Sequence, residues 1–487
     1  MRTLMINSPW IQDEERYGVK AGSRWASIRP RRETLQYYPF PFFMAYAAAS
    51  CKRAGLDVRL LDAVAEGMTT NIALHAIERF DPDICVIETA TPSINVDLRF
   101  AAMVKERFGT INIMSGPHAS AMPDHVLDGA CDVALIAEYD LTLPDLIRTL
   151  ERHGDLSEVQ GIAYKADGQV VRTPPRPLIK DLDSLPYPER DDIPLDKYTD
   201  PFCKKFPNVC IISSRGCPYE CIFCLEPYVF YGKPNYRWRR TGAVVDEIEF
   251  VMDRYGAAEI YFDDSSFSLG NKRAREISEE ILRRELSIYW SCMGDARTDY
   301  ETLALMKRAG CHGLKFGVES ADERILANIK KPLDLANVRR FVSDCHALGI
   351  YTHGTFMFGL PGETRDSIRK TLEFAFDLKL TTAQFSVATP FPGTEFYSLA
   401  KENGWLTATE WESFEGGGTP AVEYPECTHG DIIAAVRESK KRKMMRVATN
   451  PRVLAEYLEK IYRMEGVGGV LRNLWDKGGF VLGFGAR

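Results

Sequence analysis

The feature that most constrains the fold is an alternation of short apolar runs with segments of helical periodicity, which occurs in two separate stretches. Alternating strands and helices with tight connections form βαβ units and a parallel sheet covered on both faces. In the first stretch, the expected strands are Leu4–Asn7, Val58–Leu61, Ile84–Glu88, Ile111–Ser115 and Val133–Ile136. The expected helices are Pro41–Ala54, Ile72–Phe80, Leu98–Phe108 and Pro123–Gly129. The pattern predicts an α/β fold with a doubly wound parallel sheet, which binds ligands beyond the carboxyl ends of its strands.

The pattern changes after the helical segment Leu143–Arg152. Gly161–Lys165 and Val170–Thr173 flank Asp167-Gly168, a dipeptide typical of a hairpin turn. Five prolines then follow within fifteen residues, which indicates an extended linker, at Pro174, Pro175, Pro177, Pro186 and Pro188. A domain boundary is therefore expected near residue 190.

The alternation resumes in the second stretch. The expected strands are Val209–Ser213, Glu259–Phe262, Tyr289–Cys292, Gly313–Gly317, Thr355–Gly359 and Gln384–Val387. The helical segments are Val244–Tyr255, Ala274–Glu285, Glu301–Ala309, Ala336–Leu348 and Arg365–Leu378. Six repeats are too few for an eight-fold barrel, so they predict a partial, open one. Two helical segments, Gly430–Ala448 and Pro451–Met464, precede a Gly-rich ending.

Charge and composition narrow the class of protein. The 61 Lys and Arg against 68 Asp and Glu leave a net charge of -7, so no footprint for nucleic acid is visible. Residues 431–487 are locally basic, with 12 Lys and Arg against six Asp and Glu. This basic tail is either a solvated helix face or a surface for an anionic substrate, partner or lipid headgroup.

The N-terminal MRTLMINSPW lacks a basic region followed by an apolar stretch, and no run of 18 apolar residues occurs. We therefore expect a cytoplasmic protein without a transmembrane segment, with peripheral membrane contact left open. Cytosolic thiols stay free or ligate metals. Nine of the twelve cysteines are scattered singly and are interpreted as small core residues.

The other three cysteines are clustered. Cys217, Cys221 and Cys224 lie within eight residues, in the segment Ser214–Cys224. Three thiolates so spaced can hold one face of a [4Fe–4S] cluster and leave the fourth iron without a protein ligand. An open coordination site is what a metal centre needs to bind a reactant. A zinc site is the alternative, although no fourth Cys or His lies nearby in the sequence.

The spacing C-x3-C-x2-C, with Phe223 before the third cysteine, resembles the radical S-adenosylmethionine (SAM) superfamily. This resemblance implies that the amino and carboxyl groups of SAM bind the open iron. An electron then cleaves the sulfonium to yield a 5′-deoxyadenosyl radical, and the protein supplies orientation and electrostatics. It also implies an external electron donor such as flavodoxin or ferredoxin.

Further segments fall where members of that superfamily place their SAM contacts. They are Arg237–Arg240, Asp263–Phe267, Asp295–Arg297, Gly317–Ser320, Phe358–Thr364 and Pro390–Thr394. Carboxylates at strand ends lie on the catalytic face of a barrel. The predicted SAM-binding residues are Phe223, Asp263, Asp264, Arg297 and Glu319. Helix capping by the two aspartates and a structural ion pair for Arg297 are the alternatives.

The first stretch resembles the cobalamin-binding domain of cobalamin-dependent radical SAM methylases and of anaerobic Mg-protoporphyrin ester cyclase. The predicted cobalamin contacts are Thr91, Pro92, Ser93, Ser115, Gly116, His118 and Glu138. The family often has glycine where this chain has Ala137, which matters because glycine lets a flat ligand approach the backbone. The lower-ligand motif Asp-x-His-x-x-Gly is absent, and a scaffold that binds no corrin is the alternative.

Together these features predict four regions. Residues 1–150 form a cobalamin-binding-like Rossmann-type domain, 151–195 a hairpin and Pro-rich linker, and 196–400 the partial radical SAM barrel. Residues 401–487 form a C-terminal helical cap or substrate-associated region. The basic, aromatic stretch from Gly22 to Arg32 either lines the space between the domains or wraps the surface.

The resemblance implies an enzyme that methylates an unactivated carbon of a small molecule. Analogy with enzymes of this architecture favours a hydrophobic or polycyclic substrate, such as a lipid or tetrapyrrole. Radical ring closure, ring contraction or oxidation fits the same residues, and a non-catalytic iron–sulfur or corrin-binding protein is a further alternative. The sequence singles out no general acid, base or nucleophile.

Overall fold

The computed structural model describes residues 1–11, 16–21, 25–30, 38–198, 200, 202–451, 454–455, 457–459, 461–462 and 466–468. Residues 22–24 and 31–32 of the basic, aromatic stretch, and the Gly-rich ending at 478–485, lie outside the described residues. The predicted helix at 451–464 is described only in part.

The N-terminal sheet has the strand order β4-β1-β5-β6-β7-β8-β9. Its first five strands are parallel, and β8 and β9 continue it as an antiparallel hairpin. The bounds are β1 Thr3–Asn7, β4 Val58–Asp62, β5 Ile84–Glu88, β6 Ile111–Ser115, β7 Val133–Leu135, β8 Ile162–Ala166 and β9 Gln169–Arg172. The parallel order is that of a doubly wound sheet, whose ligand crevice lies between β1 and β5. This part of the predicted fold is confirmed.

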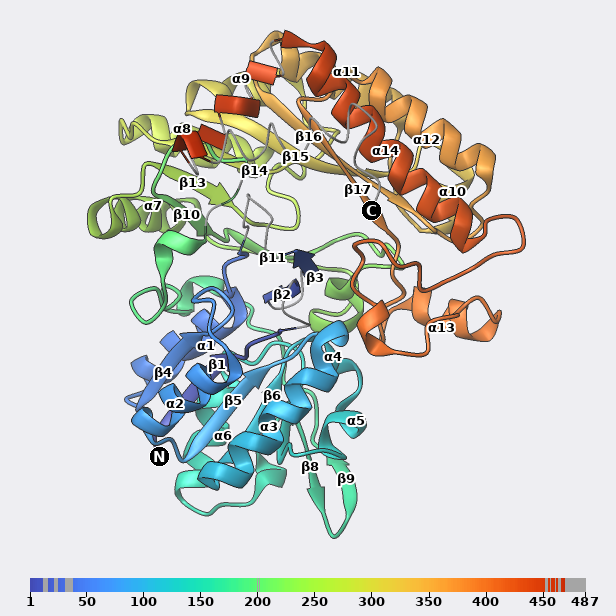
Figure 1. The fold of residues 1–487 in the computed structure, drawn as a ribbon. Coiled ribbons are helices and arrows are strands. Elements are labelled where there is room, and N and C mark those ends of the chain that lie inside the picture. Colours follow the sequence, from blue (N-terminus) through green and yellow to red (C-terminus); the bar gives the residue numbers. More distant parts are fainter. Residues whose placement is uncertain are drawn as a thin grey trace.

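Helices cover both faces of this sheet because successive side chains of a strand point to opposite faces. Met5 packs in the core under α1 and α6, whereas Leu4 and Ile6 pack under α2 and α3. The bounds are α1 Phe42–Arg53, α2 Thr70–Phe80, α3 Ile94–Phe108, α4 Pro117–Ala121, α5 Pro123–Leu127 and α6 Thr142–Glu151. Figure 1 shows this layer in the lower half of the molecule.

The second sheet has the order β10-β13-β14-β15-β16-β17, and every neighbouring pair is parallel. Among the described strands, β10 and β17 do not pair with each other, so the predicted open barrel is confirmed. The strands are β10 Asn208–Ile211, β13 Glu259–Phe262, β14 Tyr289–Met293, β15 Cys311–Glu319, β16 Tyr351–Phe358 and β17 Thr382–Val387.

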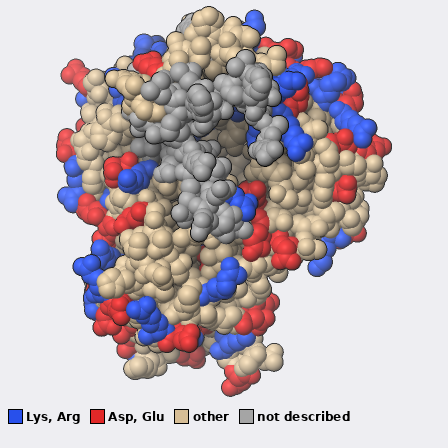
Figure 2. All heavy atoms as spheres, in the orientation of Figure 1, with Lys and Arg blue, Asp and Glu red and all other residues tan. Residues whose placement is uncertain are grey.

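Helices lie along the outer face of this open barrel (Figure 1). Their bounds are α7 Thr241–Tyr255, α8 Lys272–Arg283, α9 Tyr300–Arg308, α10 Glu323–Asn328, α11 Leu335–Ala347 and α12 Arg365–Asp377. The short helix α13, Glu395–Glu402, follows β17 and lies below these helices in the view of Figure 1. The basic helix α14, His429–Thr449, packs against α12 and β17. On the face drawn in Figure 2, cationic and anionic side chains are interspersed.

Two small hairpins were not predicted from the sequence. β2 (Arg16–Ala21) pairs with β3 (Trp25–Pro30), and β11 (Ser214–Cys217) pairs with β12 (Asn235–Trp238). Each of these strands has only four to six residues, and none belongs to the alternation of strands and helices from which the parallel sheets were predicted.

A buried ion network joins the linker to the barrel. Arg190 of the linker donates to Glu247 Oε1 on α7 at 2.8 Å, and Arg239 donates to Glu247 Oε2. Burial alone would raise the pKa of Glu247, but the two guanidinium groups outweigh it and lower that pKa. Glu247 therefore carries a buried negative charge that is shared by two cations, one of which, Arg239, also lies 3.5 Å from Asp183.

We predict that Glu247→Ala lowers the free energy of unfolding by about 3–5 kcal/mol, because it leaves buried cations without a partner. Asp246→Ala on the same helix is the control. Asp246 is 56% exposed and pairs with Arg284 at the surface, so its loss is expected to cost less than about 1 kcal/mol. Urea denaturation of both variants measures the difference, and equal losses would contradict the prediction.

Candidate cofactor site

The carboxyl ends of the two parallel sheets face each other in the middle of the molecule (Figure 1). Two contacts establish this. Arg215, which follows β10, binds Glu138, which follows β7. Gly393, which follows β17, is so close to Ala121 of α4 that an added Cβ would lie 3.0 Å from the alanine Cβ. The edges at which such sheets bind ligands thus lie next to each other.

The three predicted cluster cysteines lie on a loop that leaves β11 at this junction. β11 ends at Cys217, which pairs with Asn235 of β12. Neighbouring barrel loops hold the next turn, because Ile222 donates its amide to the Ile329 carbonyl at 3.2 Å and accepts from the Phe396 amide at 3.0 Å. All three cysteines are partly buried. The loop is therefore fixed by its backbone.

The chemistry of these thiols fits a cluster that binds with loss of protons. Burial raises the pKa of Cys217 to about 12 and also raises the pKa of Cys221 and Cys224. Such thiols become thiolates when a metal displaces their protons. Among the described residues, no three His, Cys, Asp or Glu side chains converge closely enough to hold a single metal ion. The assignment of the three cysteines to a cluster therefore stays a prediction.

Glu319 lies at a strained position at the end of β15. Its φ is +65°, and the register with β16 shifts between Gly317 and Glu319. Bulges and left-handed non-glycine residues of this kind concentrate at functional sites. The Glu319 carboxylate accepts from Lys331 at 2.7 Å, and the two groups occupy the space into which a side chain at Gly317 would extend. The glycine of this motif is therefore required by the ion pair.

Lys331 is a candidate site residue that the sequence analysis missed. Burial alone would lower the pKa of its ammonium, but the charge of Glu319 outweighs this effect and the pKa is raised. The residue before it, Lys330, places its carbonyl oxygen 3.9 Å from the Cys221 sulfur. Lys331 lies in the loop that follows α10, where a lysine carries no signal by itself. Lys331 lies twelve residues after Glu319 in the sequence. Only the fold shows that the two side chains meet, so the sequence alone could not identify Lys331 as a candidate.

The two predicted aspartates, Asp263 and Asp264, differ in burial. Asp264 is fully buried and accepts hydrogen bonds from the Ser213 hydroxyl at 2.8 Å and from the Ser214 hydroxyl. It thereby holds the turn that leads into β11. Asp263 is partly exposed at the end of β13. Contact of either carboxylate with SAM stays a prediction.

Arg297 lies against the cysteine loop, and Phe223 is part of it. Arg297 donates to Asp295 at 2.8 Å and stacks over Tyr219, with its guanidinium carbon 4.8 Å from the ring centroid. Tyr219 lies between the first two cysteines. Phe223 is partly buried and packs on the core cluster that includes Ile222. Contact of either residue with SAM stays a prediction.

The predicted cobalamin contacts gather at the carboxyl edge of the N-terminal sheet. Thr91, Pro92 and Ser93 form a turn after β5, and Ser93 donates to Asp97 at 2.6 Å. Gly116 follows β6 with a φ of +99°, and a side chain there would collide with the Thr89 carbonyl. Ser115 beside it is buried.

The same edge has unsatisfied polar groups that fit a polar ligand. Asn7 Oδ1 and Trp10 Nε1 are buried at the carboxyl end of β1, and neither has a hydrogen-bond partner within the described residues. Buried polar atoms in folded proteins are nearly always paired, so such atoms indicate a missing partner. They lie at the β1 side of the crevice in which doubly wound sheets bind ligands. The residues present therefore fit cobalamin.

His118 on α4 is fully buried. Its Nε2 lies 2.9 Å from His125 Nδ1, its Nδ1 lies 3.3 Å from the Thr91 hydroxyl, and its ring packs on Trp411. Burial lowers the pKa of His118 from its usual 6.5 to about 3, and His125 adds to the effect. His118 is therefore a neutral imidazole with both nitrogens close to protein groups.

Two further charged residues shape the crevice. Glu138 accepts from Arg215 at 2.6 Å and from Arg237 at 3.0 Å, so its carboxylate joins the two sheets. Lys20, on the unpredicted β2, is buried at the β1–β5 crevice, where it donates to Ser8 at 3.0 Å and to the Glu88 carbonyl at 3.0 Å, and pairs with Asp97. Lys20 is a second residue that the sequence analysis missed.

Comparison with known proteins gives matches over most of the chain. Two family models match it, the Radical SAM superfamily over residues 211–375 and the B12 binding domain over residues 28–147. An uncharacterized methyltransferase of Pyrococcus horikoshii is 35% identical over 381 residues, which cover 77% of this chain and 81% of the relative.

Two further proteins show a more distant likeness. The anaerobic magnesium-protoporphyrin IX monomethyl ester cyclase of Rubrivivax gelatinosus is 27% identical, over 84% of this chain and 74% of the relative. The solved structure of the cobalamin-dependent SAM radical enzyme OxsB, with aqua-cobalamin and SAM bound, matches with a TM-score of 0.70 at 15% identity. That match covers 95% of this chain and 70% of the other, and it shows the fold.

The fold and the site define a two-module cofactor enzyme, with a doubly wound sheet facing an open barrel. The chain belongs to the radical SAM enzymes that carry a B12-binding domain. The two matched families imply the cofactors of this chain. They are SAM with a [4Fe–4S] cluster in the barrel and cobalamin in the N-terminal sheet. The resemblance seen in the sequence is thereby confirmed at the level of family.

Replacement of Cys217, Cys221 or Cys224 by alanine is expected to abolish iron and sulfide binding after anaerobic reconstitution, because two thiolates cannot hold the cluster face. Cys210→Ala, at a buried thiol on β10, is the control and is expected to retain full iron content. Iron and sulfide analysis measures both. Retention of the cluster in any of the three variants would show that another group ligates it.

His118 is expected to make stability depend on pH. Its pKa of about 3 in the folded protein lies below the unfolded value of 6.5. The unfolded chain therefore binds more protons between these values, and stability falls as the pH drops below 6.5. The expected loss at pH 5 is about 2 kcal/mol. Urea denaturation from pH 7 to pH 5 should show a shallower dependence in His118→Asn, and parallel curves would contradict the prediction.

Proposed function

We propose that the chain is a methyltransferase that uses SAM, a [4Fe–4S] cluster and cobalamin to methylate an unactivated carbon of a small molecule. The observation that carries the proposal is the meeting of the two ligand-binding edges, with the Cys217–Cys224 loop on one side and the β1–β5 crevice on the other. The 35% identity to a relative named as a methyltransferase supports it.

When bound, the cluster and SAM supply a carbon-centred radical, and cobalamin supplies a methyl group carrier. This chain's own residues bind and orient these groups. Cys217, Cys221 and Cys224 provide the thiolates. The Glu319–Lys331 pair presents both a carboxylate and an ammonium beside the loop, which complement the amino and carboxyl groups of SAM. Arg297 adds a second cation next to Tyr219.

On the other side, the turn Thr91–Ser93 and the segment Ser115–Gly116 provide backbone and hydroxyl groups toward the corrin. His118 remains neutral and tied to Thr91 and His125, so we assign it to the periphery of the corrin site. The proposed division of the chain keeps residues 1–150 for cobalamin, 151–195 as the hairpin and Pro-rich linker and 196–400 for SAM. Residues 401–487 are proposed as a C-terminal helical cap or a substrate-associated region.

The substrate is proposed to be hydrophobic or polycyclic, such as a lipid or tetrapyrrole. Aromatic rings at the junction support an apolar neighbourhood, because Phe43 stacks on Phe230 at 5.0 Å and on Tyr139 at 6.3 Å between ring centroids. The second candidate is radical ring closure or oxidation, which the 27% identity to a protoporphyrin ester cyclase favours.

The external partners are also proposed. A radical SAM cluster needs a reductant, and a flavodoxin or ferredoxin is proposed as the donor. No helix in the described part of the chain is long and apolar enough to cross a bilayer. Peripheral membrane contact through the basic helix α14 stays a prediction.

The test is an anaerobic assay of the holoenzyme with SAM, a reductant and candidate polycyclic lipids and tetrapyrroles. Formation of 5′-deoxyadenosine together with S-adenosylhomocysteine is expected. The first product without the second would favour the cyclase-like alternative. The absence of both from protein with full iron and cobalamin content would refute the proposed function.

The Glu319–Lys331 pair gives a further prediction. Glu319→Gln is expected to weaken SAM binding about tenfold or more, because it removes one charge of a partly buried pair that would contact an ionic ligand. Glu323→Gln, on the exposed first turn of α10, is the control and should bind SAM as the unchanged protein does. Equilibrium dialysis of SAM with the reconstituted protein measures both, and equal affinities would remove Glu319 from the site.

A further inference from the structure

Arg215 lies two residues before Cys217 on β11, and its side chain leaves the barrel to enter the N-terminal sheet. It donates to Glu138 Oε1 at 2.6 Å and forms a bidentate pair with Asp140 at 2.8 and 2.9 Å. The side chains of Arg215 and Asp140 are only 3% and 1% exposed. A single buried side chain thus connects the cysteine strand to the loop that follows β7.

The partner strand repeats this connection. Arg237 on β12 faces Arg215 across the hairpin, and its Nη1 donates to the Glu138 carboxylate at 3.0 Å and to the Ile179 carbonyl at 2.6 Å. Two guanidinium groups therefore meet two carboxylates, and the buried charges balance. The hairpin that bears Cys217 is held at two adjacent points.

The carboxylate loop is in turn connected to the predicted corrin contacts. Ala137 has a φ of +60° and donates its amide to the Ser120 hydroxyl on α4 at 3.0 Å. Helix α4 is the segment that begins directly after Gly116. A movement of Arg215 would therefore be transmitted to Gly116 through hydrogen bonds and one short helix.

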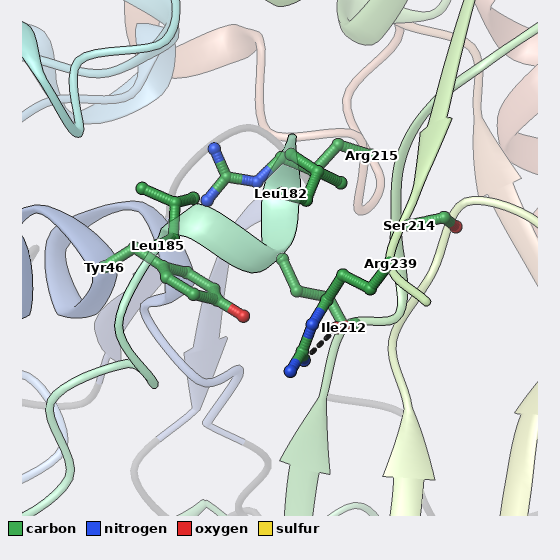
Figure 3. A pocket seen from close by; sticks show the side chains of 7 residues that line it. All are labelled: Tyr46, Leu182, Leu185, Ile212, Ser214, Arg215 and Arg239. Carbon is green, nitrogen blue, oxygen red and sulfur yellow. Dashed lines mark hydrogen bonds between the residues drawn. The ribbon is translucent and has the colours of Figure 1, made fainter. Parts of the chain in front are cut away.

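Charge pairing and one ring contact together determine where Arg215 lies. Its guanidinium carbon lies 4.8 Å from the centroid of the Tyr46 ring. A cavity of only about 10 Å³ lies beside it, lined by Tyr46, Leu182, Leu185, Ile212, Ser214, Arg215 and Arg239 (Figure 3). A bidentate guanidinium–carboxylate pair has one geometry, and sliding it would leave buried charges unpaired.

We propose that Arg215 is a positioning residue that sets the distance between the cluster loop and the corrin-binding edge. The proposal rests on the proposed function, because it presumes that both cofactors act on one substrate. Displacement of reacting groups by about 1 Å can cost roughly a hundredfold in rate, so a rigid link between the modules has a direct effect on methyl transfer. SAM cleavage, which needs the barrel alone, is affected less.

The test compares Arg215→Lys with Arg190→Lys in the holoenzyme. Lysine keeps the positive charge but cannot form the bidentate pair. Arg190 is an equally buried arginine that pairs with Glu247 away from the 137–140 loop, so its replacement controls for lost stability. Two readouts are independent of turnover. One is the magnetic coupling between the reduced cluster and cob(II)alamin in electron paramagnetic resonance, and the other is amide hydrogen exchange of residues 137–142 and 214–224 in cofactor-free protein.

In Arg215→Lys we expect weaker or more dispersed coupling, faster exchange in both segments, and a fall of about tenfold or more in methylated product per 5′-deoxyadenosine. Arg190→Lys should change none of these. Coupling and product ratio equal to those of the unchanged protein, with only lower stability, would overturn the proposal and leave Arg215 a structural tie. Failure of the proposed function would appear differently, because the unchanged protein would then form no methylated product.

Discussion

The structure depends on the burial of opposite charges where its two sheets meet. Glu138 and Asp140 on one side, and Arg215 and Arg237 on the other, are removed from water, and each charge is acceptable only because its partner is present. An apolar interface of the same size would tolerate several relative positions of the modules. The ionic interface tolerates few relative positions of the modules, because each guanidinium group must align with its carboxylate. The two ligand-binding edges are therefore held face to face.

The same principle explains how much the sequence could predict. Strand and helix positions follow from periodicity, which is a local signal, and both parallel sheets were predicted with their element order. The cysteine motif was likewise local. Lys20, Lys331 and Arg215 were missed as functional groups because their meaning depends on partners far away in the chain. Arg215 lies close to the cysteines in the sequence. Nothing local indicates that its carboxylate partners, Asp140 and Glu138, lie 75 and 77 residues earlier.

Glu138 shows how one pattern can support two interpretations. Its place after the fifth strand predicted a corrin contact, and the structure uses its carboxylate in the link between sheets. The two roles are compatible, since the loop backbone around Ala137 lies on the edge that faces the crevice. Asp264 is similar, because its oxygens hold the turn into β11 and thereby place the cysteines. The position of a residue in a motif indicates the sheet edge at which it lies. The hydrogen-bond partners of its side chain determine its structural role.

The electrostatics of the two edges differ in a way that suits their cofactors. The barrel edge combines thiols with Lys331, Arg297 and Glu319, which are charged groups that complement an ionic ligand. At the corrin edge His118 is held neutral by burial, and the charge of Lys20 is matched by Asp97. An unmatched buried charge would cost several kcal/mol, so a buried ligand edge needs neutral or paired polar groups. The described residues meet this condition at both edges, with the Glu319–Lys331 pair beside the cysteine loop and the Lys20–Asp97 pair and neutral His118 at the predicted corrin edge.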